Sequence, residues 1–195
     1  DDAWKRRETT IISKAEEVSS DELSRYGGES ASALAKTGYF HVQAVNGSWV
    51  IVDPEGNPFI SKGINSVRMG STAASVSALA DKFGHESRWP EKTVKDLRAW
   101  GFNTIGSWSD WQRLREADLR MPYTVMWNFM SGYGRKVGGV YQESGHVGYP
   151  NGCIYVFDKA FERFCDQHAQ QMLELRDDPY LLGHFSANEL PLPPA

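Results

Sequence analysis

The sequence predicts an α/β fold, and within that class a (β/α)8 TIM barrel of which these 195 residues supply about the first four βα units. Apolar strand-like runs alternate with amphipathic helical segments, a pattern typical of a parallel sheet with right-handed crossovers. The first turn from strand to helix, GINSVRMGS, lacks the glycine fingerprint of a nucleotide-binding open sheet. Polar and aromatic residues gather instead at the predicted carboxyl ends of the strands, where barrel enzymes place their chemistry. We therefore favour the barrel over an open doubly wound sheet.

The first 58 residues predict two small units before the barrel. Residues 1–38 are polar and predict a loosely packed N-terminal arm, with a short helix around Ser20–Tyr26. Residues 39–58 predict an antiparallel β hairpin, because apolar residues alternate on either side of Asn46-Gly47, a strong two-residue turn signal.

Residues 59–195 are assigned to the first half of a catalytic barrel. The predicted strands are FISKGINSV, FNTIGSWSD, MPYTVMWNF and YLLGHFSANEL. The predicted helices are WPEKTVKDLRAWG, with Pro90 in its first turn and Gly101 at its end, then WQRLREADLR, and finally DKAFERFCDQHAQQMLELRDD with Asp158 as N-cap. A long loop is expected between the first strand and its helix.

A second loop, rich in glycine, is predicted from Ser131 to Gly152. A structureless connection of this length is usually functional, so we expect it to wall one side of a cleft, with Arg135, Tyr141 or His146 touching the ligand. A mobile insertion without a role is the alternative interpretation.

Composition and charge exclude several function classes. The net charge of −4, without a dominant basic patch, argues against a nucleic-acid partner. No apolar run approaches the roughly 20 residues needed to cross a bilayer. Cys153 and Cys165 are too few for a disulfide framework, and no metal-ligand spacing occurs, so we expect neither a metal nor a cofactor.

The candidate site residues share one predicted position, the carboxyl end of a strand. They are Asn65, Arg68, Trp108, Asp110, Trp127, Asn128, Asn188 and Glu189. Several have a second interpretation: Asp110 also fits the N-cap of the following helix, and Asn65 and Arg68 also fit contacts to the backbone of the rim. Trp108 and Trp127 are candidate platforms for a sugar ring, whereas Trp100, Trp111, His168 and His184 are expected to pack in the interior.

Three segments carry a resemblance to a known family. WVIVDPEGNPFISKGINSV, LRAWGFNTIGSWSD and GHFSANEL together resemble the N-terminal half of the catalytic barrel of clan A glycoside hydrolases, and most nearly the β-agarases and related enzymes of glycoside hydrolase family 50. The resemblance implies a retaining glycoside hydrolase that cleaves the β-glycosidic bonds of a polysaccharide, an agar-like galactan. It also implies a secreted or periplasmic enzyme.

The same resemblance implies residue roles. Glu189 takes the place of the general acid/base, and Asn188 that of the asparagine that hydrogen-bonds the sugar. The family nucleophile is a glutamate near strand seven, for which this chain has no position, so the remaining half of the barrel is expected from a missing segment or a second chain. The alternatives are a non-catalytic carbohydrate-binding half-barrel, or a subunit that completes a barrel with another chain.

Two physical requirements follow for Glu189. A general acid must hold its proton near neutral pH, so we expect an apolar setting, supplied by Phe185, Ala187 and Leu190, to raise its pKa. Adjacent strand residues point to opposite faces, so Asn188 and Glu189 face one pocket only if the backbone bends there.

Overall fold

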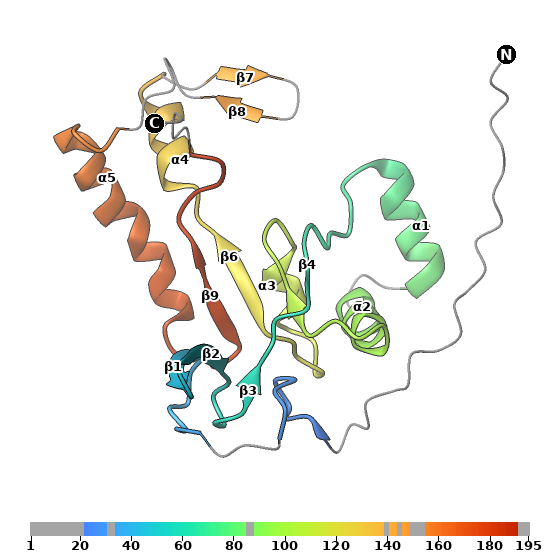
Figure 1. Cartoon of the computed structure of the whole chain (residues 1–195). Coiled ribbons are helices and arrows are strands. Elements are labelled where there is room, and N and C mark those ends of the chain that lie inside the picture. Colours follow the sequence, from blue (N-terminus) through green and yellow to red (C-terminus); the bar gives the residue numbers. More distant parts are fainter. Residues whose placement is uncertain are drawn as a thin grey trace, which may run out of the picture.

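The computed structural model describes residues 22–30, 34–84, 88–138, 141–143, 146–148 and 155–190. They form a mixed α/β fold in which helices flank a parallel sheet, with a small antiparallel sheet beneath it (Figure 1). None of the helices within these ranges is long and apolar enough to cross a membrane.

The antiparallel sheet contains β1 (His41–Val45), β2 (Ser48–Val52) and β3 (Pro58–Phe59), in that order. Asn46 and Gly47 connect β1 to β2 with φ values of 49° and 80°. Positive φ at both central residues is the signature of a type I′ turn, whose twist matches that of the flanking strands. The predicted hairpin is confirmed, with β3 as an additional strand.

The parallel sheet contains β4 (Gly63–Ile64), β5 (Thr104–Ile105), β6 (Tyr123–Met126) and β9 (Leu181–Phe185), hydrogen-bonded in sequence order. The four parallel strands were predicted, but they are shorter than their apolar runs. The run FISKGINSV is divided, because Phe59 pairs with β2 of the antiparallel sheet and only Gly63–Ile64 pairs with β5. Asn103 bridges the break: its side chain donates to the carbonyl of Ile60 and accepts from the amide of Lys62.

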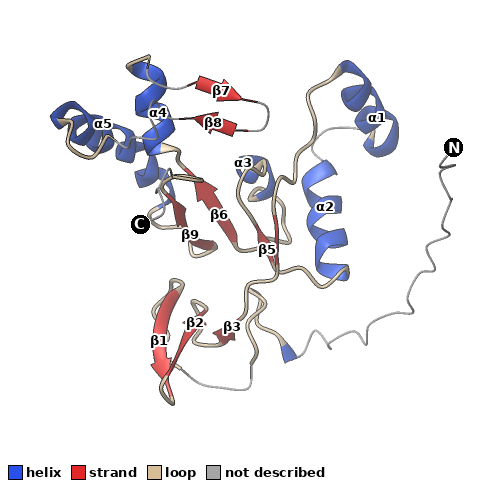
Figure 2. Cartoon of the chain, turned by 45° about the horizontal axis from the view of Figure 1, so that its top comes forward, coloured by secondary structure: helices blue, strands red, loops and turns tan. Residues whose placement is uncertain are grey.

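Within the described ranges, five α-helices accompany the parallel sheet, with α1 and α2 on one side and α4 and α5 on the other (Figures 1 and 2). They are α1 (Ala73–Phe83), α2 (Arg88–Ala99), α3 (Trp111–Leu114), α4 (Phe129–Lys136) and α5 (Lys159–Ala169), which continues as a 3-10 helix over Gln170–Leu175. The predicted caps of two helices are confirmed. Asp158 accepts a hydrogen bond from the amide of Ala160 at 2.8 Å, and Gly101, with φ +83°, follows the end of α2.

Both predicted loops were wrong in part. The connection after β4 contains α1, which starts at the N-cap Thr72, ends at Gly84 and contains no buried residue. The glycine-rich segment begins inside α4, where Arg135 is exposed in the last turn, and continues into the hairpin of β7 (Tyr141–Glu143) and β8 (His146–Gly148). The side chains of Tyr141 and His146, and all of Cys153, lie outside the described residues.

The core lies between the sheet and α2, α3 and the 3-10 helix. Its buried members are Trp89, Val94, Leu97, Ile105, Leu114, Ala117, Met121, Tyr123, Val125 and Leu175. Trp111 packs on it as expected, with its ring stacked on Tyr123 at a centroid distance of 5.7 Å. The expectation for Trp100 was wrong: it lies just beyond the end of α2 and is 70% exposed.

The N-terminal arm packs against the lower end of the sheet more firmly than its polar sequence predicted. Tyr26 is 2% exposed, and its ring lies 4.6 Å from that of Tyr180. The hydroxyl of Ser24 donates to the fully buried carboxylate of Asp53, which also accepts from the amides of Glu55 and Asn57. The arm therefore joins the β2–β3 turn to the sheet.

Candidate functional site

The carboxyl ends of all four parallel strands lie along one edge of the sheet, at the top of Figure 1. Each strand is followed within four residues by a non-glycine residue with positive φ: Ser66 at 58°, Trp108 at 61°, Asn128 at 55° and Glu189 at 48°. Among the described residues, the other such residue is Asn46 in the hairpin turn. Backbone strain of this kind clusters at functional sites, because it directs side chains that a regular strand would not direct there.

The segments after β4 and β5 form a joined rim above the sheet. The amide of Ser66 donates to the carbonyl of Ser107 at 3.0 Å, and the amide of Val67 donates to Oγ of Ser109 at 3.0 Å. The amide of Asp110 then donates to the carbonyl of Val67 at 2.9 Å. These bonds continue the β4–β5 pairing beyond the strands and fix the positions of the side chains between them.

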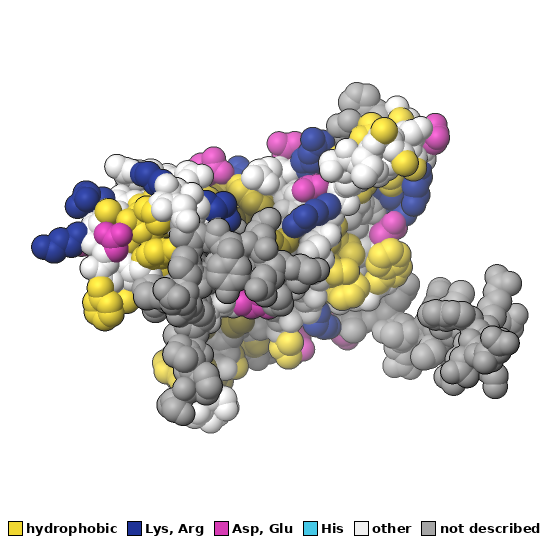
Figure 3. Space-filling model, turned by 90° about the horizontal axis from the view of Figure 1, so that it is seen from above, with side chains coloured by type: hydrophobic (Ala, Val, Ile, Leu, Met, Phe, Trp, Pro, Cys, Tyr) yellow, Lys and Arg dark blue, Asp and Glu magenta, His cyan; other side chains and the backbone are white. Residues whose placement is uncertain are grey.

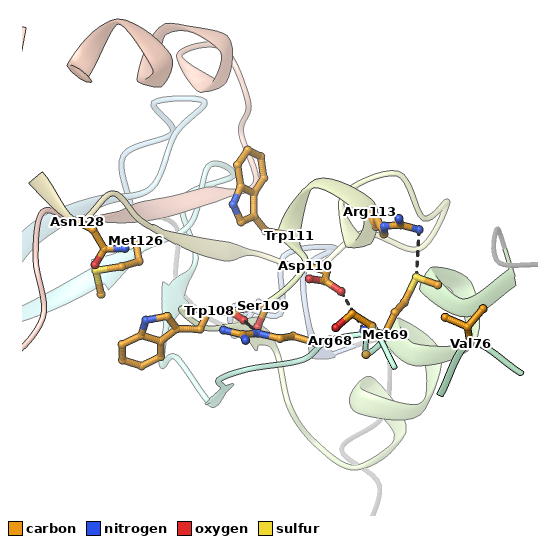
Figure 4. Close-up of a pocket in the computed structure, with 12 residues that line it drawn as sticks. Arg68, Met69, Val76, Trp108, Ser109, Asp110, Trp111, Arg113, Met126 and Asn128 are labelled. Carbon is orange, nitrogen blue, oxygen red and sulfur yellow. Dashed lines mark hydrogen bonds between the residues drawn. The ribbon is translucent and has the colours of Figure 1, made fainter. Parts of the chain in front are cut away.

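A pocket of about 560 Å³ opens beside this rim (Figure 4). It is bounded by the ends of β4, β5 and β6 and by α1. The residues that line it are Arg68, Met69, Gly70, Ser71, Val76, Trp108, Ser109, Asp110, Trp111, Arg113, Met126 and Asn128. The pocket therefore includes four of the eight predicted site residues: Arg68, Trp108, Asp110 and Asn128.

Arg68 and Asp110 both use part of their bonding capacity to hold the rim. Arg68 donates from Nε to the carbonyl of Trp108 at 2.5 Å, which is the backbone contact considered as an alternative for this residue. Asp110 accepts from the amide of Met69 at 2.9 Å through Oδ2, and its side chain makes no capping hydrogen bond to α3. Asp110 thus occupies the N-cap position of α3 as considered, but its carboxylate turns across to the β4 segment and does not cap the helix (Figure 4).

The two candidate aromatic platforms lie in different surroundings. Trp108 is 40% exposed and lines the pocket, with its ring directed away from the core (Figure 4). Trp127 does not line this pocket. Its indole packs edge-on against His168 of α5 and donates from Nε1 to Nδ1 of His184 at 2.8 Å. Of the two candidate platforms, Trp108 is therefore the one that lines the pocket.

Asn128 and Asn65 lie at the ends of neighbouring strands. Asn128 precedes α4 in a left-handed conformation and lines the pocket. Asn65 is exposed just beyond β4, and its side chain lies over Gly106, where a Cβ atom would come within 1.9 Å of Oδ1. Gly106 is thus the residue that leaves room for the amide of Asn65.

Asn188 and Glu189 are both exposed at a bend that follows β9. The positive φ of Glu189 confirms the predicted departure from regular strand geometry. Neither residue lines the pocket next to Trp108. The expected apolar surroundings are only partly present, because Phe185 is 49% exposed and Leu190 is 38% exposed.

Two histidines flank Trp127 beneath this edge. Nε2 of His168 lies 2.7 Å from the carbonyl oxygen of Trp127, and Nδ1 of His168 lies 3.0 Å from Nε2 of Gln171. Partial burial lowers the pKa of His184. Both histidines have satisfied hydrogen bonds as expected, although His184 is exposed rather than enclosed.

Several pocket residues were not predicted from the sequence. Val76 belongs to α1, a helix that was not predicted, and Met126 is the last residue of β6 but was not among the predicted site residues. Arg113 lies on α3 and donates from Nη1 to the sulfur of Met69 at 3.2 Å. The signal available for α1 was Thr72 as N-cap before an alanine-rich run that ends at Gly84.

Viewed onto this edge, the surface is chemically mixed (Figure 3). Hydrophobic, basic and acidic side chains lie next to one another, and neither charge dominates the visible face. This mixture suits a ligand that offers both apolar faces and many neutral polar groups.

The chain is similar to known β-agarases in sequence and in structure. No protein-family model matches it. It is 27% identical to Beta-agarase A of Vibrio sp. (strain JT0107), over 44% of this chain and 14% of the relative. It is 42% identical to Beta-agarase B of the same strain, over 24% of this chain and 5% of the relative.

Among solved structures, the chain superposes on BpGH50 with a TM-score of 0.69 at 23% identity, covering 87% of this chain and 38% of that one. The agarase AgWH50C gives a TM-score of 0.64 at 21% identity, covering 87% and 32%. These matches establish the shared fold. The chain spans well under half the length of each of these proteins. The predicted resemblance to β-agarases is confirmed over part of the chain.

Proposed function

We propose that this chain is the part of a retaining glycoside hydrolase that carries the general acid/base, Glu189, and that the substrate is an agar-like β-galactan. The four parallel strands are then the first half of a (β/α)8 barrel, preceded by the arm (1–38) and the hairpin (39–58), with the rest supplied by a later segment or a second chain. The similarity to β-agarases supports the reaction class. An enzyme that acts on such a polymer is expected to be secreted or periplasmic.

The observation that carries the proposal is the position of the Asn188–Glu189 bend. It follows β9, on the same edge of the sheet as the pocket, and Glu189 has a φ value of 48°. Catalytic residues of barrel enzymes come from the carboxyl ends of different strands, which meet at this edge.

In the proposed reaction, Glu189 gives its proton to the glycosidic oxygen as the leaving sugar departs. A second carboxylate, expected from a later strand, attacks the anomeric carbon from the opposite side. The two carboxyl groups of a retaining enzyme are about 5–5.5 Å apart. Glu189 then acts as the base that takes a proton from the water that releases the product. Asn188 would hydrogen-bond the sugar at the scissile bond.

The pocket fits a binding role beside this centre. Trp108 offers a partly exposed aromatic face, while Asn128, Arg68 and Asp110 offer polar groups to sugar hydroxyls. The saccharide rings that follow the cleaved bond would lie along this wall.

The test uses the protein expressed from its full reading frame and compares Glu189→Gln with Glu174→Gln, an exposed glutamate on the 3-10 helix. Loss of a general acid should lower agarose hydrolysis by roughly 10²- to 10⁴-fold. Binding of an agarose oligosaccharide, measured by calorimetry, should remain. An aryl galactoside with an acidic phenol leaving group needs little protonation, so cleavage of its bond should be much less impaired.

The configuration of the first product, followed by NMR, tests retention separately. If Glu189→Gln hydrolysed agarose at the wild-type rate, Glu189 could not be the general acid. A first product with inverted configuration would contradict the retaining mechanism.

A further inference from the structure

The turn from β6 into α4 is attached to β9 by a continuous set of hydrogen bonds centred on Trp127. The amide of Trp127 donates to the carbonyl of Phe185 at 2.9 Å, and the amide of Phe129 donates to the carbonyl of Ser186 at 2.8 Å. The indole Nε1 of Trp127 donates to Nδ1 of His184 at 2.8 Å. Two main-chain bonds and one side-chain bond therefore span the same pair of strands.

The indole bond fixes the protonation state of His184. An indole N–H can only donate, so Nδ1 of His184 must be an unprotonated acceptor, and the ring proton of the neutral imidazole lies on Nε2. His168 has the complementary role, because Nε2 faces the carbonyl oxygen of Trp127 and must donate to it. Trp127 is thus held at its ring by one histidine and at its backbone by another.

This set of bonds connects the two parts of the proposed site. On one side, Trp127 immediately precedes Asn128, which lines the pocket in a left-handed conformation. On the other side, Phe185 and Ser186 lead directly into Asn188 and Glu189. A displacement of Trp127 would change the distance between the pocket wall and the glutamate.

We propose that His184 is a positioning residue: by accepting the indole proton of Trp127, it holds the wall of the pocket at Asn128 in register with the segment that carries Glu189. The inference rests on the proposed function, because it assigns His184 a role in the same reaction. His184 has no contact with substrate in this role, and its effect passes through Trp127.

The arrangement makes the site sensitive to acid. Protonation of His184 at Nδ1 would place an N–H opposite the indole N–H, so the bond would be lost. Because partial burial lowers the pKa of His184, the bond should persist at neutral pH and break below about pH 6.5, the usual range of histidine. His168 on α5 contacts the same Trp127 ring, and the β6 residue paired with His184 is Val125, which is neither an acid nor a base. Lys136 of α4 lies over the ring of Phe164, and that ring in turn stacks on His168.

The test compares His184→Asn with His184→Leu in the protein expressed from its full reading frame. The amide oxygen of asparagine can accept the indole proton at the place of Nδ1, whereas leucine cannot accept it. His41→Asn on β1, in the antiparallel sheet, is the matched control. The first readout is the indole ¹H–¹⁵N resonance of Trp127, assigned from its loss in Trp127→Phe.

That resonance should titrate with a midpoint below about pH 6.5 in the wild type and in His41→Asn, and should not titrate in His184→Asn. The second readout is the pH profile of kcat and KM on agarose oligosaccharides. Misplacement of reacting groups costs about 10- to 100-fold, so His184→Leu should lose that much in kcat/KM at neutral pH. The kcat/KM of His184→Asn should stay within about threefold of the wild-type value at neutral pH. Its pH profile should lack the fall in acid that protonation of His184 causes in the wild type.

The outcomes separate the two proposals. Wild-type protein without galactan hydrolysis would refute the proposed function itself. If the wild type is active and His184→Leu has the same kcat/KM and the same pH profile, the positioning role alone is refuted. If His184→Leu does not fold, an unchanged acid limb in the folded His184→Asn variant would overturn the inference equally.

Discussion

The carboxylate of Asp110, beyond β5, accepts a hydrogen bond from the backbone amide of Met69, beyond β4, at 2.9 Å. The bond joins two loops that are 41 residues apart in the sequence and that form one wall of the pocket. Asp110 therefore holds the pocket wall in place through this bond, independently of any contact with a ligand.

Replacement of Asp110 by alanine should lower the free energy of unfolding by about 1.5–3 kcal/mol, because a hydrogen bond to a charged acceptor is lost. Asp110→Asn keeps an acceptor and should recover most of that loss. Urea denaturation of both variants measures the difference. Equal stability of Asp110→Ala and the wild type would show that the rim does not depend on this bond.

Replacement of Trp108 by alanine should weaken binding of an agarose oligosaccharide by about tenfold, because the aromatic face in the pocket is removed. Trp100→Ala is the matched control, since Trp100 is even more exposed but does not line the pocket. Calorimetric titration of the two variants decides the matter. A similar loss of affinity in both would show that Trp108 has no special place in binding.

Gly106→Ala tests the role of Asn65. The added Cβ would come within 1.9 Å of Oδ1 of Asn65 and force its amide away. We expect a loss of kcat/KM on agarose oligosaccharides of about tenfold if Asn65 hydrogen-bonds substrate, from misplacement of a substrate-binding group. Gly183→Ala in β9 meets nothing within 4 Å and should leave kcat/KM unchanged. Full activity of a folded Gly106→Ala variant would exclude Asn65 from substrate binding.

Asp178 should make the stability of the protein fall in acid. Burial by itself would raise the pKa of Asp178, but hydrogen bonds from the amide of Tyr180, the hydroxyl of Tyr123 and the guanidinium of Arg120 outweigh it and lower the pKa. Its contribution is therefore complete above about pH 4, the unfolded pKa of an aspartate, and is lost as the pH falls through the lower folded value.

Thermal unfolding between pH 2 and pH 7 measures this dependence. Asp178→Asn should flatten the acid part of the curve, and Asp178→Ala should cost about 3–5 kcal/mol at neutral pH because Arg120 is left without its carboxylate. An exposed pair, Arg176 and Asp177, provides the control: Asp177→Asn should change the acid part of the curve little. Parallel curves for wild type and Asp178→Asn would contradict the assignment.

The features that were predicted correctly depend on local sequence. Asn46-Gly47 specifies its turn because few residues tolerate positive φ at both positions, and Asp158 is an N-cap through a contact only two residues away. Gly101 ends α2 for the same kind of reason. The succession of the four parallel strands follows from the alternation of strand and helix.

The features that were missed depend on partners distant in the sequence. Helix α1 has a short apolar stripe and no fully buried residue, although Leu79 and Phe83 pack against the edge of the core. The carboxylate of Asp110, at the N-cap position of α3, binds Met69 instead, a partner that is brought close only by the pairing of β4 with β5. The sequence also does not show that His168 and His184 flank the ring of Trp127, whose role as a sugar platform stays a prediction.

The left-handed backbone at Ser66, Trp108, Asn128 and Glu189 has a consequence for directed evolution of this protein. In a library randomised at these four codons, Val, Ile and Thr should be depleted among folded clones before any selection for activity, because branched side chains resist this conformation. Gly, Asn and Asp should be enriched instead. A tryptophan or a glutamate retained at such a position against that bias would owe its survival to what the side chain does for the reaction.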